Sequence, residues 1–214
     1  MTREREWKFD LGSEAAAARL EKRLGSPVDA RLQENRFFDT RARDLRRERW
    51  ALRLRAEWLW AAGATPPDGG LLPARVPERV ILSLKGPREG AGALHERREE
   101  QVQLRPELWR TQIDPASHLP ASWRGLLPAP CEALDEVVRF TNLRRTFRFG
   151  ARWRAQIDRT HFGPGRRVWE LELEIAPADD AEVARIALAS LFDEAGVAAR
   201  EQERSKLQRA LDRA

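Results

Sequence analysis

The feature of this sequence that most constrains its fold is a set of short segments in which charged and apolar residues alternate. Residues 170–175 carry a glutamate at every second position with apolar side chains between, and residues 3–11 and 51–57 follow the same pattern with charges of both signs. An extended strand places alternate side chains on opposite faces. Each segment therefore predicts a strand with one charged face and one apolar face, and the fold must provide surroundings for both.

Two arrangements accommodate such strands. An ordinary half-buried sheet turns its apolar face inward and leaves the charged face in water. A closed antiparallel barrel turns the charged faces toward its interior, and helices cover the apolar outside. Because every strand pairs a charged face with an apolar one, we predict an α+β fold built on such a barrel. The strand segments are 3–11, 29–40, 51–57, 80–85, 94–104, 137–148, 153–160 and 168–175.

The connections between these strands carry helix and loop signals. Ser13 is a suitable cap for the first helix, which Gly25 and Pro27 terminate. The strand at 80–85 is predicted to end at Gly86-Pro87, and the stretch 60–77, rich in Gly, Ala and Pro, reads as an inserted loop that forms either a lid or a surface loop. Helices are predicted at 13–24, 180–195 and 201–213, with short helices within 106–134.

Composition narrows the class of protein further. Of the 214 residues, 34% are charged and 42% hydrophobic, which is typical of a globular protein rich in ionic groups. The formal net charge of +5 favours polyanionic partners such as phosphates. No apolar run reaches the roughly 20 residues that cross a bilayer, the tryptophans do not interleave with a basic stripe, and the one cysteine, Cys131, cannot form an internal disulfide. We expect a cytoplasmic protein that binds neither a membrane nor nucleic acid.

The charged positions fall into two chemical groups. Clustered glutamates supply hard oxygen ligands suited to Mg²⁺ or Mn²⁺, and arginines and lysines from several strands can surround phosphoryl oxygens. Each desolvated ion costs several kcal/mol unless it is paired or hydrated, so an interior of this kind needs a functional reason. Any single one of these side chains could equally be a solvated surface charge, but together they describe a site for a metal-bound polyphosphate. The acids are Glu4, Glu6, Glu170, Glu172 and Glu174, and the bases are Lys8, Arg53, Arg55, Lys85, Arg97, Arg145 and Lys206.

The sequence also resembles a known family. Glu4-Arg5-Glu6-Trp7-Lys8 is similar to the Glu-x-Glu-x-Lys signature of CYTH domains, the triphosphate tunnel metalloenzymes, which include inorganic triphosphatases, thiamine triphosphatases and class IV adenylate cyclases. The resemblance covers essentially the whole chain and implies an eight-stranded antiparallel tunnel in a single CYTH domain over residues 1–214. The other matches follow in the family's order: Phe38-Asp39-Thr40, Leu52-Arg53-Leu54-Arg55, Leu84-Lys85-Gly86, Leu94-His95 with Arg97 and Glu99, Arg145, Asp158, the Glu170 to Glu174 alternation and Ser205-Lys206.

The resemblance implies roles for individual residues. Glu4, Glu6 and the carboxylates of the Glu170 strand would hold one or two divalent metal ions, and Lys8 would lie beside the scissile or terminal phosphate. Alternation alone does not choose the functional face of strand 94–104, but Glu99, and not Glu100, fits the family's spacing. We expect Lys8, Glu4 and Glu6 to be catalytic. The expected metal ligands are Glu4, Glu6, Glu99, Asp158, Glu170, Glu172 and Glu174, and the expected substrate-binding residues are Lys8, Arg53, Arg55, Lys85, Arg97, Arg145 and Lys206.

Three functions are compatible with this pattern. The first is a hydrolase, dependent on Mg²⁺ or Mn²⁺, that removes the terminal phosphate of tripolyphosphate, a related triphosphate or a short polyphosphate. The second is a class IV adenylate cyclase that makes cyclic AMP and pyrophosphate from ATP. The third is a non-catalytic polyphosphate- or nucleotide-binding module, which gains nothing from carboxylates that repel its ligand. We expect the first, in a protein that is either a monomer or a homodimer.

Overall fold

Eight antiparallel strands close into a barrel in the part of the chain that the computed structural model describes, namely residues 2–61, 63–64, 72–89, 92–110, 113–128, 131–176 and 178–212. Their hydrogen-bonded order is β5-β4-β3-β2-β6-β7-β8-β1, and the ring closes because β1 pairs with both β8 and β5. A short strand, β9, pairs with the end of β1. The α+β class and the eight-stranded antiparallel barrel are confirmed. The strands are β1 (Thr2–Asp10), β2 (Asp29–Asp39), β3 (Ala51–Leu59), β4 (Arg79–Glu89), β5 (Leu94–Leu104), β6 (Asp135–Phe149), β7 (Trp153–His161), β8 (Arg167–Glu174) and β9 (Arg200–Glu201).

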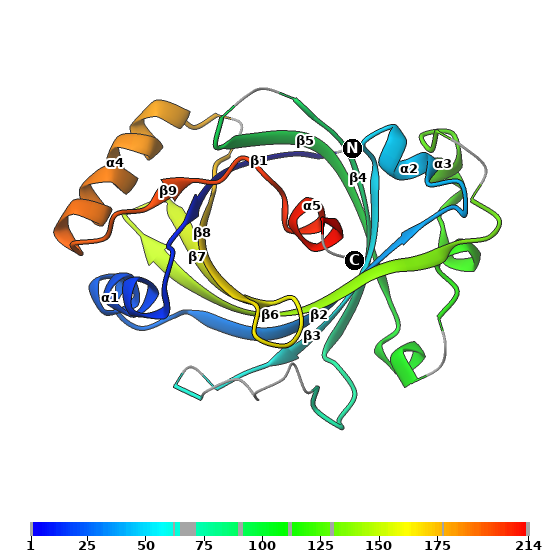
Figure 1. Cartoon of the computed structure of the whole chain (residues 1–214), viewed down its shortest axis with the longest axis horizontal. Helices are drawn as coiled ribbons and strands as arrows, with labels where there is room; N and C mark the ends of the chain where they lie inside the picture. The colour runs from blue at the N-terminus through cyan, green and yellow to red at the C-terminus, as the bar shows by residue number, and fades with distance from the viewer. Residues whose placement is uncertain are drawn as a thin grey trace.

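Helices flank the barrel on two sides, and one helix lies within its outline. Figure 1 shows α1 and α4 together against one flank, α2 and α3 at the opposite flank, and α5 inside the ring of strands. Among the described residues, no helix combines the length and the apolar character needed to cross a membrane. The helices are α1 (Glu14–Leu24), α2 (Asp44–Arg47), α3 (Ala121–Arg124), α4 (Ala181–Glu194) and α5 (Lys206–Leu211), with the 3₁₀ helices η2 (Pro106–Arg110) and η3 (Pro115–His118).

The apolar faces of the strands pack outward against these helices. Leu171 and Leu173 of β8 are fully buried in one cluster with Leu20 of α1 and Leu188 of α4. On the opposite flank a second cluster joins β3 and β4 to the segment that carries the 3₁₀ helices and α3. Fully burying a leucine side chain contributes roughly 1.5–3 kcal/mol. The outer contacts therefore stabilise the barrel and leave its interior available for polar groups.

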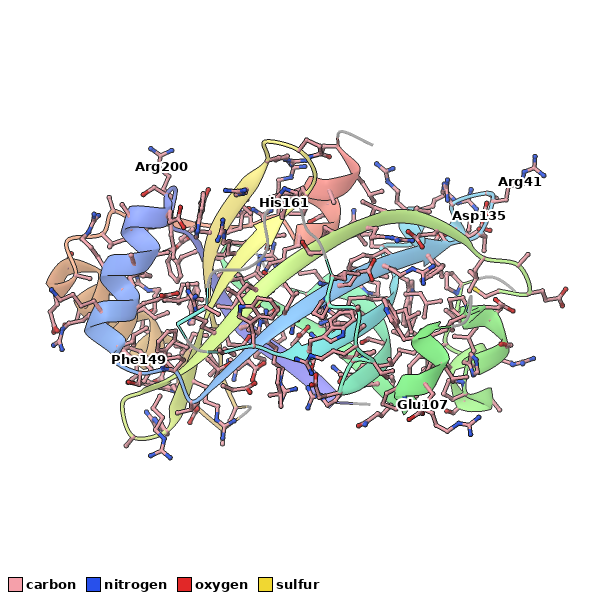
Figure 2. The ribbon with its side chains drawn as sticks, turned by 90° about the horizontal axis from the view of Figure 1, so that it is seen from below. Arg41, Glu107, Asp135, Phe149, His161 and Arg200 are labelled. Atoms are coloured by element: carbon pink, nitrogen blue, oxygen red, sulfur yellow. The ribbon has the colours of Figure 1, made fainter. Side chains whose placement is uncertain are left out.

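Alternation along each strand decides which residues face the interior, and β6 is an example. In Figure 2, β6 runs alongside β2 from Asp135 at one end of the molecule to Phe149 at the other. Leu143 and Phe147 of β6 are buried, at 2% and 1% exposure, and Phe147 belongs to the outer cluster that contains Leu171. Alternation then turns Asn142, Arg144 and Thr146 toward the interior.

Two boundaries differ from the sequence prediction by more than two residues. β4 does not end at Gly86-Pro87 but continues to Glu89, because a register shift between Lys85 and Arg88 accommodates the proline as a bulge. The last helix begins at Lys206 and not at residue 201, because Ser205 and Gln208 form a reciprocal capping box. The loop expected at 60–77 includes residues 62 and 65–71, which lie outside the described residues.

Candidate active site in the barrel interior

The inward faces of the strands enclose a cavity of about 890 Å³. Basic side chains outnumber acidic ones along the described part of its wall, so the cavity suits a polyanion better than a neutral ligand. The basic lining residues are Arg3, Arg5, Lys8, Arg31, Arg53, Arg55, Arg79, Lys85, Arg97, Arg144, Arg152, Arg154 and Lys206, and the acidic ones are Glu4, Glu6, Asp29, Glu57, Glu99, Glu172 and Glu174.

Strands β1 and β8 bring the carboxylates together. In their antiparallel register Glu6 lies opposite Glu174, and Lys8 lies opposite Glu172. Like charges directly opposite each other destabilise a sheet, but Lys8 Nζ lies 2.9 Å from Glu6 Oε1 and 2.8 Å from Glu172 Oε1. Burial lowers the pKa of Lys8, yet Glu172 and Glu6 outweigh it and raise that pKa above its usual value. Lys8 is therefore a charged bridge between the two acidic strands.

Helix α5 adds a second cation to this acidic wall. Lys206 Nζ lies 2.7 Å from Glu172 Oε1, 2.8 Å from Asp158 Oδ2 and 3.1 Å from Glu170 Oε2. Arg144 donates to both oxygens of Asp158, at 2.8 and 2.6 Å, and also contacts Glu172. Burial raises the pKa of Asp158, but Arg144 and Lys206 outweigh it and lower the pKa from 3.8 to about 2. Asp158, Glu172, Arg144 and Lys206 are therefore all ionised at neutral pH.

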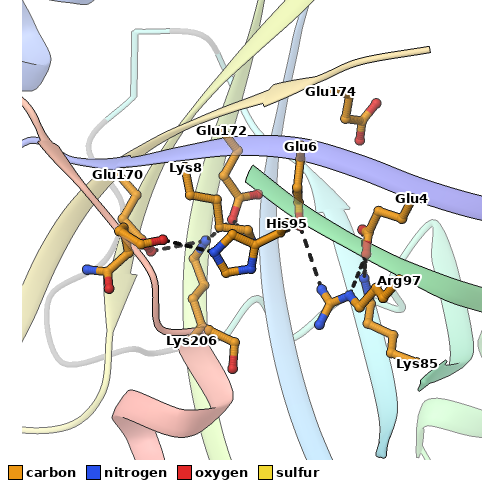
Figure 3. A network of polar contacts seen from close by, with 12 residues as sticks. Glu4, Glu6, Lys8, Lys85, His95, Arg97, Glu170, Glu172, Glu174 and Lys206 are labelled. Carbon is orange, nitrogen blue, oxygen red and sulfur yellow. Dashed lines mark hydrogen bonds and ion pairs between the residues drawn. The ribbon is translucent and has the colours of Figure 1, made fainter. Parts of the chain in front are cut away.

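Glu4 is held at the other end of the acidic wall by two cations from neighbouring strands. Figure 3 shows Glu4 next to Lys85 and Arg97, whereas Lys8 and Lys206 lie nearer Glu172. Lys85 Nζ is 2.7 Å and 2.9 Å from the two oxygens of Glu4, and Arg97 Nε is 2.7 Å from Glu4 Oε2. Burial raises the pKa of Glu4, but the charges of Lys85 and Arg97 bring it well below its usual range. The inward face of β5 is thus the one that carries Arg97.

The wall formed by β3 and β4 is basic and incompletely neutralised. Glu57 accepts hydrogen bonds from Arg79 at 2.9 and 2.5 Å, and Arg55 Nε lies 3.0 Å from Glu57 Oε1. The buried Nε groups of Arg53 and Arg55 nevertheless have no aligned hydrogen-bond acceptor among the described residues. Burial lowers the pKa of Arg55 to about 9, and the neighbouring charge of Arg53 adds to this effect. An anion bound here would satisfy these donors.

Glu6 is a buried carboxylate whose negative charge is incompletely compensated. Its Oε1 is buried and, although it lies close to Lys8, it accepts no aligned hydrogen bond from the described residues. Burial raises the pKa of Glu6, and the negative charge of Glu4 raises it further. The cavity therefore holds an under-neutralised carboxylate and an under-neutralised arginine pair. A ligand that presents positive charge to Glu6 and negative charge to Arg53 and Arg55 would satisfy both.

The carboxylates of the cavity are suitable metal ligands, although in this structure they are paired with basic side chains. Among the described residues, no group of three His, Cys, Asp or Glu side chains is arranged to hold a metal. The carboxylates are instead paired with lysine and arginine. Carboxylate oxygens are nonetheless the ligands that a hard cation such as Mg²⁺ or Mn²⁺ prefers. Glu4 and Glu6 share one face of β1, Glu172 and Glu174 lie on the adjacent strand, and the buried Oε1 of Glu6 has an unused acceptor position.

Most of the residues expected from the sequence meet in this cavity. Asp158 and Glu170 lie beneath Lys206, at 0% and 1% exposure, and so face its ammonium instead of the open space. Glu99, and not Glu100, lies on the wall. The expected residues that line the cavity are Glu4, Glu6, Lys8, Arg53, Arg55, Lys85, Arg97, Glu99, Glu172, Glu174 and Lys206.

The structure corrects the role expected for Arg145. We expected it to bind substrate, but it lies on the outer face of β6, where Nη1 donates to Glu21 of α1 at 2.9 Å. Arg145 has the same parity as Leu143 and Phe147, whose burial fixes the outward face of the strand. Arg144, one residue earlier, occupies the wall. The alternation of Leu143 and Phe147 was a sequence signal that could have identified it.

Other members of the charge network were missed from the sequence. Arg209 of α5 brings Nη2 to within 2.5 Å of Glu170 Oε2, and its position depends on how the C-terminal segment enters the barrel. Glu57 was recognised on the charged face of β3 but not as the acceptor for Arg79. No periodicity within one segment predicts such pairings, because they join strands through the closed sheet.

The Phe38-Asp39-Thr40 match has a structural explanation. The buried carboxylate of Asp39 accepts hydrogen bonds from the backbone N–H groups of Thr40, Leu45 and Arg46, at 2.8, 2.9 and 3.0 Å. It thereby organises the turn between β2 and the first residues of α2. This motif shapes the connection into β3, which carries the two arginines of the basic wall.

Comparisons with known proteins agree with this architecture. A family model for the CYTH domain matches residues 2–210. One similar structure is a candidate adenylyl cyclase from Hippeastrum described as having a dominant triphosphatase activity, with 23% identity, a TM-score of 0.76 and coverage of 96% of this chain and 93% of that one. Another is a candidate adenylate cyclase from Bacillus halodurans, with 20% identity, a TM-score of 0.68 and coverage of 98% of each chain. The Mimivirus capping enzyme triphosphatase gives 12% identity, a TM-score of 0.50 and 89% coverage of each. At these identities the similarity shows the fold alone, and no curated protein matches the chain.

Proposed function

Since this chain belongs to the CYTH domain family, we propose that it is a divalent-metal-dependent triphosphatase that removes the terminal phosphate of tripolyphosphate or a related triphosphate. The members of this family are metal-dependent enzymes that act on triphosphates. The finer assignment to hydrolysis of an inorganic or related triphosphate is our proposal, and the chemistry of the cavity supports it.

The observation that carries the proposal is the opposed charge imbalance inside one cavity. The pKa of Glu6 is raised by burial and by Glu4, whereas that of Arg55 is lowered to about 9 by burial and by Arg53. A polyphosphate alone would satisfy the arginines but would be repelled by the glutamates. A cation alone would do the reverse. A triphosphate carrying Mg²⁺ or Mn²⁺ answers both requirements together.

The residues would divide the work as follows. Glu4, Glu6 and Glu172 would hold the metal, which when bound supplies Lewis acidity toward phosphoryl oxygens and neutralises part of their charge. Arg53 and Arg55 would bind phosphoryl oxygens at the basic wall, and the triphosphate would be oriented by charge-assisted hydrogen bonds.

Lys8 would stabilise the reacting phosphate. Its ammonium lies between Glu6 and Glu172, at the boundary of the acidic wall, where it can donate to an oxygen of the terminal phosphoryl group. As water adds to the terminal phosphorus, the bridging P–O bond breaks and its electron pair remains on the departing diphosphate. A fixed ammonium stabilises the charge that develops during this step. The products are orthophosphate and the shortened phosphate chain.

The cavity wall also bears on the choice between hydrolase and cyclase. Phe37 and Phe140 are the aromatic residues among the described lining, and their rings stack on each other with centroids 5.6 Å apart. A nucleotide base commonly stacks on an aromatic face, and each of these two rings already has one face covered by the other. This arrangement favours a substrate whose recognition depends on phosphate, such as tripolyphosphate. A class IV adenylate cyclase is the alternative, in keeping with the naming of two similar structures.

A product panel tests the proposal. The purified protein is incubated with tripolyphosphate, thiamine triphosphate or ATP, in Mg²⁺, Mn²⁺ or excess EDTA, and orthophosphate, pyrophosphate and cyclic AMP are quantified. We expect metal-dependent orthophosphate release from tripolyphosphate and none in EDTA. Cyclic AMP and pyrophosphate from ATP as the main products would establish the cyclase instead. Tight binding of tripolyphosphate without turnover under any metal condition would favour the binding module.

A further inference from the structure

The segment that carries Lys206 into the cavity is fastened to the barrel just before the helix begins. We define residues 200–205 as the strap. Its first residues pair with β1 as the short strand β9, and the backbone N–H of Gln202 then donates to the carbonyl of Lys8 at 2.9 Å. Figure 1 shows this segment crossing from the flank of α4 into the ring of strands, where α5 follows. The strap therefore sets where α5 enters the barrel.

His95 holds the carbonyl group of the same residue, Gln202. Its side chain comes from the inward face of β5, is 2% exposed, and places Nε2 2.9 Å from the carbonyl oxygen of Gln202. A carbonyl oxygen only accepts hydrogen bonds, so Nε2 carries the proton and donates. Gln202 is thus bound through its N–H to β1 and through its C=O to β5. These are the two strands whose pairing closes the barrel.

Only two residues, Glu203 and Arg204, separate this anchor from the cap of α5. Ser205 accepts a hydrogen bond from the backbone of Gln208 and starts the helix, and Lys206 is its first residue. Lys206 Nζ makes three short contacts with carboxylates of β7 and β8. Over so short a connection, a shift of the Gln202 peptide is transmitted to the first turn of α5. The reach of Lys206 into the cavity therefore depends on where the strap is held.

We propose that His95 is a positioning residue that sets Lys206 in the active site by holding the carbonyl of Gln202. Its imidazole need not touch the substrate, and it acts through the strap. The proposal rests on the proposed function in one respect, namely the expectation from the sequence that Lys206 binds the triphosphate. The placement of the strap itself is independent of any reaction.

Two substitutions of His95 separate positioning from simple loss of packing. His95→Leu fills the buried space but donates no hydrogen bond, whereas His95→Gln keeps an N–H donor at a similar reach. The loss of one neutral hydrogen bond corresponds to roughly a 3- to 10-fold effect. We expect His95→Leu to raise KM for tripolyphosphate by about that factor with a smaller change in kcat, and His95→Gln to restore most of it. His118→Leu, in the outer helix η3, is the matched control and should behave like the wild type.

A double-mutant cycle with Lys206→Ala tests the route of the effect. If His95 acts through Lys206, His95→Leu should raise KM in the wild-type background and have little further effect in Lys206→Ala, because residues that act through one another are not additive. Equal effects in both backgrounds would overturn the proposal, since a general loss of stability acts the same way in each.

Hydrogen–deuterium exchange provides a readout that needs no turnover. We expect the amides of residues 200–206 to exchange faster in His95→Leu than in the wild type, and His95→Gln to restore their protection. Unchanged exchange in His95→Leu would refute the positioning role whether or not the protein hydrolyses a triphosphate. If the wild type shows no turnover on the product panel, the proposed function fails separately. The cycle is then measured on the affinity for tripolyphosphate, and additive effects there would also overturn the role.

Discussion

Two adjacent arginines on β6 provide a sharp test of the barrel and of its charge network. Arg144 faces the interior and binds both oxygens of Asp158, whereas Arg145 faces outward and pairs with Glu21 at a partly exposed site. Replacing each by alanine removes the same side chain from the same strand. The two variants should differ strongly in stability and in activity, because only one of them removes a cation from the cavity.

The expected loss of stability follows from the pKa of Asp158. That pKa falls from 3.8 to about 2 in the folded protein, which corresponds to about 2.5 kcal/mol of stabilisation at neutral pH. Burial opposes the shift, and Arg144 and Lys206 share the work of lowering it. Arg144→Ala should therefore lower the free energy of unfolding by roughly 1–2 kcal/mol. Arg145→Ala removes a partly exposed ion pair and should cost less than about 1 kcal/mol.

The sign of the pH dependence follows from the same shift. Because the folded pKa is lowered, the unfolded chain binds the proton first as the pH falls. The stabilisation from Asp158 is complete above about pH 4 and disappears between about pH 4 and pH 2. Urea titrations in EDTA over this range should show a smaller loss on acidification for Arg144→Ala than for the wild type.

Activity supplies the second half of the comparison. Arg144 lines the cavity and would also donate to a phosphoryl oxygen of a bound triphosphate. Losing such a charge-assisted hydrogen bond corresponds to about 1.5–3 kcal/mol, or roughly a 10- to 150-fold increase in KM. We expect that increase for Arg144→Ala and a KM close to the wild type for Arg145→Ala. Equal effects of the two substitutions, or a larger effect of Arg145→Ala, would refute the assignment of the inner face of β6.

The remaining predictions concern the acidic wall, α5 and the outer core. Glu6→Gln should fold normally and lose metal-dependent turnover by about two orders of magnitude, and the loss should be smaller for the more exposed Glu174→Gln. A larger loss of phosphate release in Glu174→Gln than in Glu6→Gln would argue against Glu6 as the principal metal-facing group. Lys206→Ala should raise KM for tripolyphosphate by roughly 10-fold or more, and an unchanged KM would remove it from substrate binding. Leu173→Ala should lower the free energy of unfolding by about 2–5 kcal/mol in a urea titration, whereas Ile186→Ala, at 58% exposure, should change it by less than about 0.5 kcal/mol. Similar losses of unfolding free energy in the two variants would contradict the outward-packed core.

Alternation within single segments made most of the barrel predictable. On β8 the glutamates and leucines occupy strictly alternate positions, so assigning the leucines to the outer face assigns the glutamates to the inner face. On β5 both faces are rich in charge, and the sequence alone did not decide between them. The closed sheet decides, because the pairing of Arg97 with Glu4 across β1 and β5 turns that face inward.

Contacts between segments far apart in the sequence were harder to predict from the sequence. Arg144 and Arg145 are chemically identical, and only the burial of Leu143 and Phe147 distinguishes their faces. The start of α5 depends on a capping box at Ser205 and on the hydrogen bonds of Gln202 to two strands far away in the sequence. Local propensity does not encode these tertiary restraints, so the strap and the role of His95 required the structure.

Following tripolyphosphate by ³¹P NMR in ¹⁸O-labelled water tests most directly whether the barrel hydrolyses a metal-bound triphosphate. With Mg²⁺ or Mn²⁺ present, we expect one orthophosphate and one pyrophosphate per tripolyphosphate, with the labelled oxygen in the orthophosphate and no reaction in EDTA. The Glu6→Gln protein should leave the tripolyphosphate signals unchanged over the same time. Metal-independent cleavage, or full activity of Glu6→Gln, would contradict the claim that the acidic and basic walls of the barrel act together on a metal-bound triphosphate.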